Sequence, residues 1–189
     1  MKLATVGFLK KEDKIILAKK KQHIHVGEEK LDKSKETYNG YGGKFEVDTD
    51  KDIEDTAIRE LDEESGGVKG DKKDLVKIGE VEFFWPNNNT NDPNMFVSFY
   101  IIDKYIGSPI ETDEMYSPEE FLEKDIPYGF MMGADKEIIP KMFENKSGFL
   151  KFKVHHFESG EYKIEEVGEI NKEIKRNINV NEKFRVNIV

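Results

Sequence analysis

Three glutamates, Glu60, Glu63 and Glu64, stand close together in a stretch that has the signals of a helix. Because residues three and four apart share one face of a helix, their carboxylates are expected to lie side by side. Like charges repel, and the helix dipole disfavours negative charge in the last turn. A divalent cation removes this conflict, since Mg²⁺ binds carboxylate oxygens together with phosphate oxygens and water. The cluster therefore predicts a magnesium site, against the alternative of a solvated acidic helix face.

A helix is expected to carry these glutamates, beginning at about Asp52 and ending at the glycine pair Gly66-Gly67. Aspartate is a good N-cap residue, and glycine suits the C-terminal cap. Ile53, Ala57 and Leu61 recur every four residues and form an apolar stripe, which is expected to pack inward. The glutamates would then be held by a helix that is anchored to a core.

The glycine pair Gly42-Gly43, a loop, the helix and the run Arg59-Glu60-Leu61-Asp62-Glu63-Glu64-Ser65-Gly66 follow one another along the chain. This order closely resembles the Nudix box, whose pattern is Gly, five residues, Glu, seven residues, Arg-Glu-apolar-x-Glu-Glu-x-Gly-apolar. The second half matches at every fixed position up to Gly66. The resemblance implies a hydrolase that uses Mg²⁺ or Mn²⁺. The metal ligands that it implies are a backbone carbonyl of Gly42 or Gly43, and the side chains of Glu60, Glu63, Glu64 and Glu114.

The first half of the box departs from the pattern. Counting back from Arg59, Lys51 stands where the family has its first Glu. A two-residue insertion within residues 46–51 accounts for the shift. Asp50 and Asp52 are then the two candidates for the missing carboxylate.

The composition narrows the class of protein. The chain has 189 residues, a net charge of -9 and no cysteine, and its length suits one domain with some extra material. The negative charge argues against a nucleic-acid polymer or an anionic membrane as partner, because those partners need basic patches. Disulfides, zinc thiolate sites and cysteine nucleophiles are excluded. No stretch has the length of a signal peptide's apolar region or of a membrane span, so we expect a soluble, cytoplasmic protein.

The apolar pattern predicts strands on both sides of the central helix. Strands are expected at residues 3–9, 14–20, 75–85, 95–105, 149–155 and 162–167, the first two and the last two as hairpins. Further helices are expected at 117–122, where Ser117 and Pro118 form a helix-start signal, and at 135–145. Residues 27–37 and 87–94 are predicted loops. Strands around a central helix indicate an α+β fold, and the resemblance implies the Nudix fold, a mixed β-sheet sandwiched between helices (α/β/α).

One domain accounts for most of the chain. The Nudix hydrolase domain is expected to span residues 1–167. Residues 168–189 are rich in Asn, Lys and Glu and are expected to form a C-terminal appendage that is either disordered or adds one strand. The oligomeric state stays open between monomer and dimer.

Other segments resemble the branch of the family that cleaves oxidised purine nucleoside triphosphates such as 8-oxo-dGTP. Residues 39–44 match its Asn-Gly-aromatic-Gly-Gly-Lys motif, in which the asparagine, here Asn39, hydrogen-bonds the purine. Residues 107–115 resemble its Gly-x-Pro-x-Glu-Ser-Asp-Glu-Met segment, whose last Glu, here Glu114, is a further metal ligand. Asp135 falls where an aspartate reads the base edge. The substrate-binding residues that the resemblance implies are Thr5, Lys20, Asn39, Lys44, Phe83, Trp85, Met95, Met132 and Asp135.

The base pocket departs from that branch at two positions. Met132 takes the place of a tryptophan, and Ala134 takes the place of the first of two aspartates. A lost stacking ring and a lost acceptor each change discrimination by about 1–3 kcal/mol. The reaction class therefore follows more directly from the sequence than the substrate does.

The resemblance implies hydrolysis of a nucleoside triphosphate to the monophosphate and pyrophosphate, in a role of nucleotide-pool sanitation. Glu64 is the first candidate for assisting deprotonation of the attacking water, with Glu63 next, and Arg59 is expected to pair with a carboxylate of the box. The alternatives are a Nudix hydrolase of another substrate, such as ADP-ribose, a dinucleoside polyphosphate or an unmodified nucleotide, and a Nudix module that binds a nucleotide without cleaving it. A structural Ca²⁺-binding domain is disfavoured, because the sequence has no Asp-rich twelve-residue loop.

Overall fold

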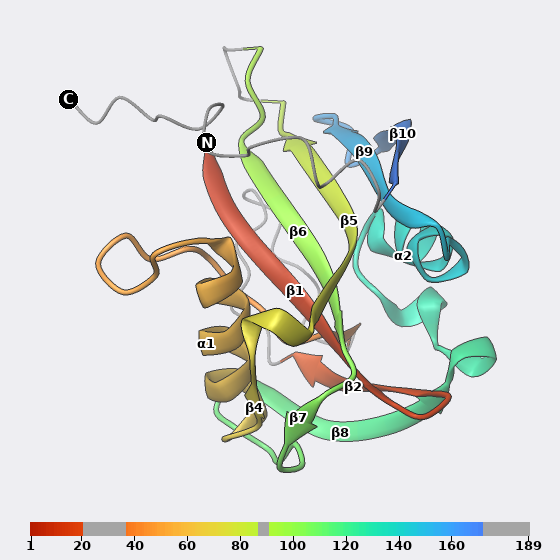
Figure 1. Ribbon diagram of the computed structural model, residues 1–189. Helices are drawn as coiled ribbons and strands as arrows, with labels where there is room; N and C mark the ends of the chain where they lie inside the picture. Colours follow the sequence, from red (N-terminus) through yellow and green to blue (C-terminus); the bar gives the residue numbers. More distant parts are fainter. Residues whose placement is uncertain (21–36, 87–90, 172–189) are drawn as a thin grey trace.

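A mixed β-sheet with a helix on each side organises the chain (Figure 1). The computed structural model describes residues 1–20, 37–86 and 91–171. In chain order the elements are β1 (Lys2–Lys11), β2 (Lys14–Lys20), β3 (Tyr38–Asn39), α1 (Ile53–Ser65), β4 (Lys69–Gly70), β5 (Leu75–Phe84), β6 (Met95–Ile102), β7 (Tyr105–Ile106), β8 (Met115–Leu122), α2 (Asp135–Glu144), β9 (Gly148–His156) and β10 (Tyr162–Asn171). Short 3₁₀ turns lie at Lys72–Asp74, Glu123–Asp125 and Tyr128–Phe130.

The strands of the main sheet follow the order β10-β9-β5-β6-β1-β2-β3, and β8 pairs along β2 from Lys14 to Lys20. β1 runs parallel to β6 and β5 runs parallel to β9, whereas the remaining pairs are antiparallel. β4 and β7 form a separate two-stranded ribbon. The predicted mixed sheet is therefore confirmed.

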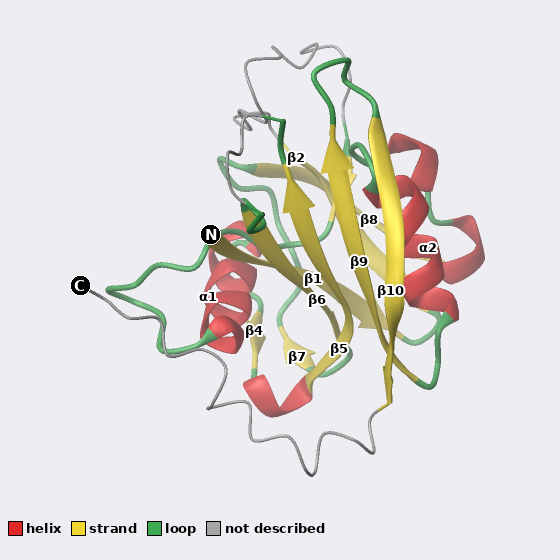
Figure 2. Cartoon of the chain, turned by 90° about the horizontal axis from the view of Figure 1, so that it is seen from above, coloured by secondary structure: helices red, strands yellow, loops and turns green. Residues whose placement is uncertain are grey.

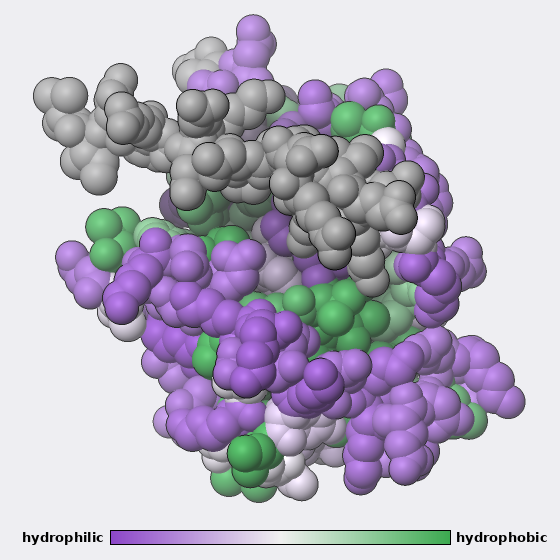
Figure 3. All heavy atoms as spheres, viewed as in Figure 1, coloured by the Kyte–Doolittle hydropathy of each residue, from purple (hydrophilic) through white to green (hydrophobic). Residues whose placement is uncertain are grey.

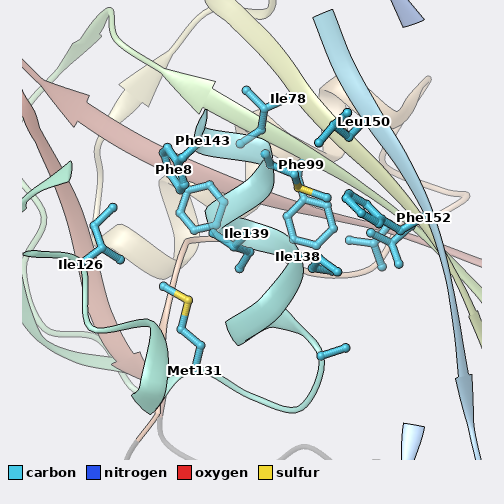
Figure 4. Packing of buried hydrophobic residues seen from close by; sticks show 14 of the residues in the cluster. Phe8, Ile78, Phe99, Ile126, Met131, Ile138, Ile139, Phe143, Leu150 and Phe152 are labelled. Atoms are coloured by element: carbon cyan, nitrogen blue, oxygen red, sulfur yellow. The ribbon is translucent and has the colours of Figure 1, made fainter. Parts of the chain in front are cut away.

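The sheet separates two apolar clusters, one under each helix. Phe8 belongs to the cluster that contains the buried side chains of α2, and its neighbour Leu9 belongs to the cluster that contains Leu61 of α1. Consecutive residues of a strand point to opposite faces, so α1 and α2 cover opposite faces of the sheet, as Figure 2 shows. On the α2 side the rings of Phe8 and Phe143 lie 5.2 Å apart (Figure 4). The predicted α/β/α layers are confirmed.

The α1 helix has the caps and the apolar stripe that its sequence predicts. The side chain of Asp52 accepts a hydrogen bond from the backbone N–H of Asp55, and Gly66 ends the helix with a φ of 73°, which favours glycine. Ala57 and Leu61 are fully buried. The stripe therefore fixes the rotation of α1, and with it the direction in which the glutamates point.

The segment from Tyr41 to Phe45 runs beside β1 and brings the glycine pair to α1. The backbone N–H of Gly7 donates to the carbonyl of Tyr41 at 2.6 Å, and the N–H of Phe45 donates to the carbonyl of Leu3 at 2.9 Å. This pairing continues the sheet without forming a full strand. The glycine pair is therefore held at a fixed distance from the end of α1.

The predicted helix at 117–122 is wrong, because residues Met115–Leu122 form strand β8. Ile15 pairs with Phe121 and Lys20 with Met115 across β2 and β8, and the register shifts between Leu17 and Lys19. The Ser117-Pro118 pair lies at this irregularity, where a proline that lacks an N–H is tolerated in a sheet. Pairing with β2 has therefore overridden the local helix-start signal.

Other boundaries differ by a few residues. The strand predicted at 95–105 ends at Ile102, and Tyr105–Ile106 belong to the small ribbon. β10 continues past Val167 to Asn171, with a bulge between Glu166 and Gly168. Residues 172–189 lie outside the described residues, so the appendage stays a prediction. Most of the predicted loops at 27–37 and 87–94 also lie outside them.

The exposed face around α1 is mostly hydrophilic (Figure 3), in keeping with a net charge of -9. In the described part of the chain, neither helix has the length and apolar character that crossing a bilayer requires.

Candidate active site

Asp50 is the carboxylate that partners Arg59. The Nε and Nη2 atoms of Arg59 donate to the two oxygens of Asp50, each at 2.9 Å. Asp50 is buried, and it also accepts from the Thr56 hydroxyl at 2.9 Å and from the backbone N–H of Glu46 at 2.9 Å. The hydrogen bond from Arg59 holds the pKa of Asp50 at about 2. Of the two candidates for the missing carboxylate, Asp50 therefore occupies the position beside Arg59, and Asp52 is the N-cap of α1.

Arg59 also contacts two glutamates of the run. Its Nη1 atom donates to Glu60 at 2.9 Å and to Glu63 at 3.0 Å. The Glu60 side chain is only 13% exposed, whereas that of Glu63 is 60% exposed. Burial raises the pKa of Glu60 to about 6, and the charges of Glu64 and Glu63 add to this rise while Arg59 opposes it. The carboxylates thus repel one another in a partly desolvated place, as the sequence predicts.

Glu64 is almost fully buried and binds two groups from other elements. One oxygen lies 2.7 Å from the Lys20 ammonium, and the other accepts the backbone N–H of Gly42 at 2.6 Å. Burial raises the pKa of Glu64, Lys20 and Gly42 oppose the rise, and the charge of Glu114 adds to it. The Glu64 carboxylate therefore joins α1, the end of β2 and the glycine pair.

The glycine pair is closely packed, Gly42 against the backbone of β1 and Gly43 against the side chain of Glu60. A Cβ atom on Gly43 would lie 2.3 Å from a carboxylate oxygen of Glu60, and a Cβ atom on Gly42 would lie 2.1 Å from the carbonyl oxygen of Thr5. The Gly43 carbonyl accepts the N–H of Thr5 at 2.9 Å. The Gly42 carbonyl lies 3.5 Å from the Lys20 ammonium. Of the two predicted carbonyl ligands, that of Gly42 is thus the one that faces the same cation as Glu64.

The chemistry of these donors fits a divalent cation. The Glu64 carboxylate and the Gly42 carbonyl converge on one positive group, the ammonium of Lys20. Hard oxygen donors of this kind are those that Mg²⁺ and Mn²⁺ prefer. Within the described ranges, however, no three Asp, Glu or His side chains form one ion-binding group. Instead, Lys20 pairs with Glu64, and Arg59 pairs with Asp50, Glu60 and Glu63.

Glu114 is placed near this region by the loop that precedes β8. The N–H of Ile110 donates to the carbonyl of Ser65 at 2.9 Å, and the Thr112 hydroxyl donates to the carbonyl of Glu64 at 3.2 Å. These bonds hold the loop against the end of α1. The Glu114 side chain is exposed, and its charge reaches Glu64. The structure therefore brings the predicted metal ligands into one region, at the end of α1 and its neighbouring loops.

The predicted base-binding residues lie mostly on the α2 side of the sheet. Phe83 pairs with Met95 across β5 and β6, and both pack against the cluster under α2. The rings of Phe83 and Trp85 stack at 6.0 Å. Asp135 is the first residue of α2, and desolvation raises its pKa to about 7. Phe83 and Met95 thus lie on the α2 side of the sheet, and Asp135 begins the helix.

The remaining predicted substrate residues are more dispersed. Asn39 pairs with Ala18 across β3 and β2 and is half-buried. Met132 is partly exposed, and its carbonyl accepts the N–H of Asp135 at 2.9 Å. The Lys44 side chain is exposed, while its carbonyl accepts from Arg59 at 3.0 Å.

Thr5 is not brought together with Asp135. Ala4 and Phe8 of β1 belong to the cluster under α2, and strand alternation turns Thr5 to the opposite face. Its hydroxyl is buried and has no hydrogen-bond partner among the described residues. The substrate-binding role of Thr5 stays a prediction.

The sequence does not point to a role for two further ring-bearing residues beside Phe83 and Trp85. The His156 ring lies 6.1 Å from the Phe83 ring and 6.0 Å from the Trp85 ring. Tyr162 pairs with His156 across β9 and β10. The only sequence signal is that His156 follows Val154 by two residues in the closing strand, which places both side chains on the same face of the sheet.

The mixed sheet, α1 and the Arg-Glu-x-x-Glu-Glu run with its glycine pair define a hydrolase of the Nudix class. No family model matches the chain. Over 172 residues the chain is 33% identical to the oxidized purine nucleoside triphosphate hydrolase of Danio rerio, a match that covers 89% of this chain and 97% of the relative. The protein of the same name from Mus musculus is 31% identical over 141 residues, covering 73% of this chain and 84% of the relative. The chain therefore belongs to the Nudix hydrolase family, with oxidized purine nucleoside triphosphate hydrolases among its relatives.

A solved structure supports the fold independently. The crystal structure of the MutT protein from Bacillus halodurans matches with a TM-score of 0.65, over 87% of this chain and 98% of that chain. The sequence identity in this match is 16%. The likeness therefore concerns the fold alone.

Proposed function

We propose that the protein hydrolyses oxidised purine nucleoside triphosphates such as 8-oxo-dGTP to the monophosphate and pyrophosphate, and so sanitises the nucleotide pool. The names of the relatives in Danio rerio and Mus musculus support this substrate class. The observation that carries the reaction type is the convergence of Glu64 and Gly42 on the ammonium of Lys20. A buried carboxylate and a carbonyl that contact one cation can bind a divalent ion, and such an ion neutralises the charge of a phosphate chain.

Mg²⁺ or Mn²⁺ is the cofactor that this donor set fits. The residues that would hold it are Glu60, Glu63, Glu64 and Glu114, with the carbonyl of Gly42. When bound, such an ion neutralises phosphate charge and lowers the pKa of its bound water. In this proposal the chain itself supplies the oxygen donors at the end of a rigid helix.

The side chains of the site then have separate tasks. Glu64 is the first candidate to accept the proton of the attacking water, because its pKa is raised by burial and it lies among the other acidic groups. Glu63 is the second candidate, since it is the most exposed carboxylate of the run. Arg59 is a positioning residue, because its fork holds Glu60 and Glu63 while Asp50 anchors it from behind. Lys20, which contacts Glu64, would be free to face the phosphates if a divalent ion took its place beside that carboxylate.

In this proposal the purine is held by Asn39, Phe83, Met95 and Asp135, of which Phe83 and Met95 pack on the α2 side of the sheet and Asp135 begins α2. Desolvation that raises the pKa of Asp135 to about 7 lets its carboxyl donate or accept a hydrogen bond near neutral pH. Met132 and Ala134 remove a ring and an acceptor that the branch has. A changed preference among purines is therefore the specific alternative that the chain supports.

Pyrophosphate release with Mg²⁺ tests the proposal on 8-oxo-dGTP, 2-oxo-dATP, dGTP, dATP and ADP-ribose. We expect an oxidised purine triphosphate to be preferred, and Glu64→Gln to lose turnover by about 100-fold or more. Preference for ADP-ribose or an unmodified nucleotide would reject the substrate, and full turnover in Glu64→Gln would reject the assignment of the base. Binding without any hydrolysis would favour the non-catalytic module. A cytoplasmic location and a monomeric or dimeric state stay predictions of the sequence.

A further inference from the structure

Four rings from three neighbouring strands form a cluster on the face of the sheet that α2 covers. Phe83 and Trp85 come from β5 and the residue after it, His156 comes from β9, and Tyr162 comes from β10. The planes of Trp85 and His156 differ by only 8°, and those of Phe83 and His156 differ by 24°. Their centroids lie 6.0 Å and 6.1 Å apart. The planes of Phe83, Trp85 and His156 are thus nearly parallel and their centroids are about equally far apart, whereas the Tyr162 ring is tilted by 55° from His156. A further flat ring can pack against this group by offset stacking.

The beginning of α2 lies against this ring cluster. Tyr162 donates its hydroxyl to Glu137 in the first turn of α2, and the ammonium of Lys136 lies 6.0 Å from the Tyr162 ring. The charge of Asp135 is close enough to contribute to the raised pKa of Tyr162, after burial and Glu137. The ring cluster and the predicted base-reading carboxylate are therefore parts of one region.

This region contains a buried polar group that has no hydrogen-bond partner in the described part of the chain. The indole N–H of Trp85 is buried and has no hydrogen-bond partner among the described residues. The Asp135 carboxyl is only partly buried. Buried donors and acceptors normally find a partner. A ligand with complementary polar edges, such as a purine base, would supply one.

Two of the rings, those of Trp85 and His156, can also be reached from outside. A hollow of about 520 Å³ opens where the parallel strands β5 and β9 reach their carboxyl ends, and Trp85, Pro86, His156 and Phe157 help to line it. Burial lowers the pKa of His156, so its imidazole is neutral at physiological pH and keeps one donor and one acceptor. A neutral ring of this kind stacks on a base without needing a counter-charge.

We propose that His156, beside Trp85, is a specificity-determining residue that stacks on the purine base, in place of the tryptophan ring that Met132 does not supply. The inference rests on the proposed function, because it names a contact of the same substrate. It assigns the aromatic surface of the base pocket to strand β9 instead of to the segment before α2. His156 acts on the base alone and takes no part in the hydrolysis.

Binding of the nucleoside monophosphate in EDTA tests this without any metal or turnover. Trp85 is the only tryptophan of the chain, so its fluorescence reports ligands that reach the ring cluster, and calorimetry gives an independent dissociation constant. The ligands are 8-oxo-dGMP and dGMP, with dCMP as the smaller base. We expect His156→Ala to weaken purine binding by about 5- to 100-fold, the range for loss of one stacked ring, and His156→Phe to restore most of it.

His155→Ala is the matched control. His155 also borders the hollow, but it stacks on Phe84 at 4.5 Å and, by strand alternation, lies on the face of the sheet opposite the ring cluster. The variant therefore distinguishes a contact with the ring cluster from a general effect on the hollow. We expect it to bind purines as the wild type does. Equal losses in His155→Ala and His156→Ala, unchanged binding in His156→Ala, or a wild type that binds neither purine would each overturn the proposal.

Steady-state kinetics distinguish the contact of His156 with the base from the proposed hydrolysis. We expect His156→Ala to raise KM for the preferred triphosphate and to leave kcat within about threefold, because a stacking contact holds the base equally before and during the reaction. A wild type that binds purine monophosphates through His156 but hydrolyses no triphosphate would reject the function and retain the contact. A wild type that is active, with the same KM in His156→Ala, would reject the contact and retain the function.

Discussion

Arg59 and Asp50 form a two-point ion pair that ties the loop before α1 to the glutamates of the helix. Two nitrogens of Arg59 each lie 2.9 Å from an oxygen of Asp50, and a third contact reaches the carbonyl of Lys44 at 3.0 Å. The guanidinium then offers Nη1 to Glu60 and Glu63. Asp50 thus sets the orientation from which Arg59 holds two of the predicted metal ligands.

Replacing Asp50 by asparagine is expected to destabilise the protein by about 3 kcal/mol, because the largely buried guanidinium of Arg59 loses its two-point anionic partner. Both side chains are largely buried, with exposed fractions of 14% for Arg59 and 1% for Asp50. Urea unfolding at neutral pH measures the change. Asp52→Asn is the control, since asparagine caps a helix as well as aspartate does. Equal stability of the two variants would contradict the structural role of Asp50.

The same pair predicts how stability responds to acid. The hydrogen bond from Arg59 lowers the pKa of Asp50 from 3.8 to about 2 in the folded protein, so the unfolded chain takes up the proton first as the pH falls. The stabilisation is therefore complete above about pH 4 and is lost as the pH falls towards 2, by about 2 kcal/mol. Unfolding free energies between pH 2 and 6 should show this loss in the wild type and lack it in Asp50→Asn. Parallel pH curves for the two proteins would contradict it.

Local signals were sufficient to predict α1. Asp52, Gly66 and the apolar stripe act within one helix, and each appears in the structure with its expected role. The Ser117-Pro118 signal is equally local, yet these residues lie in β8, because pairing with β2 involves residues about a hundred positions away. The sequence carries that interaction only in the complementarity of two distant strands.

In the candidate site, too, some features could be predicted from local sequence and others could not. The glutamate face of α1 could be predicted from spacing, whereas the choice between Asp50 and Asp52 could not, because it depends on how the inserted loop turns its side chains. His156 lies beside Trp85 through the parallel pairing of β5 and β9. No regular spacing links these two positions, so only the assembled sheet identifies the contact.

Lys20 is expected to substitute for a divalent ion beside Glu64. The Glu64 side chain is 3% exposed, so Lys20→Met leaves a buried carboxylate without its cation and should lower the free energy of unfolding in EDTA by about 3 kcal/mol. Added Mg²⁺ should then stabilise the variant more than the wild type, because the ion has no ammonium to displace. Thermal unfolding with and without Mg²⁺ measures both effects.

The control for this experiment is Lys14→Met. Lys14 pairs with Glu120 at 2.9 Å on the surface, and a pair of this kind contributes less than about 1 kcal/mol. Its response to Mg²⁺ should equal that of the wild type. An equal increase in melting temperature for Lys20→Met and the wild type would show that Lys20 and the ion do not compete.

Asp135 predicts a pH dependence of the opposite sign. Desolvation raises its pKa from 3.8 to about 7 in the folded protein, so the folded state retains the proton while the unfolded state loses it. The contribution of Asp135 to the free energy of unfolding is therefore most favourable below about pH 4, and it is lost as the pH rises through 7. Asp135 keeps some contact with solvent, so we expect a loss of about 2 kcal/mol, smaller than the full shift implies.

Asp135→Asn removes this titration while preserving the shape of the side chain. The variant should resemble the wild type near pH 4 and exceed it in stability by about 2 kcal/mol near pH 8, as measured by urea unfolding across this range. Asp125→Asn, at an exposed position, should show no such change. A constant difference between Asp135→Asn and the wild type at every pH would mean that the Asp135 carboxyl is ionised throughout, and that it meets the base only as an acceptor.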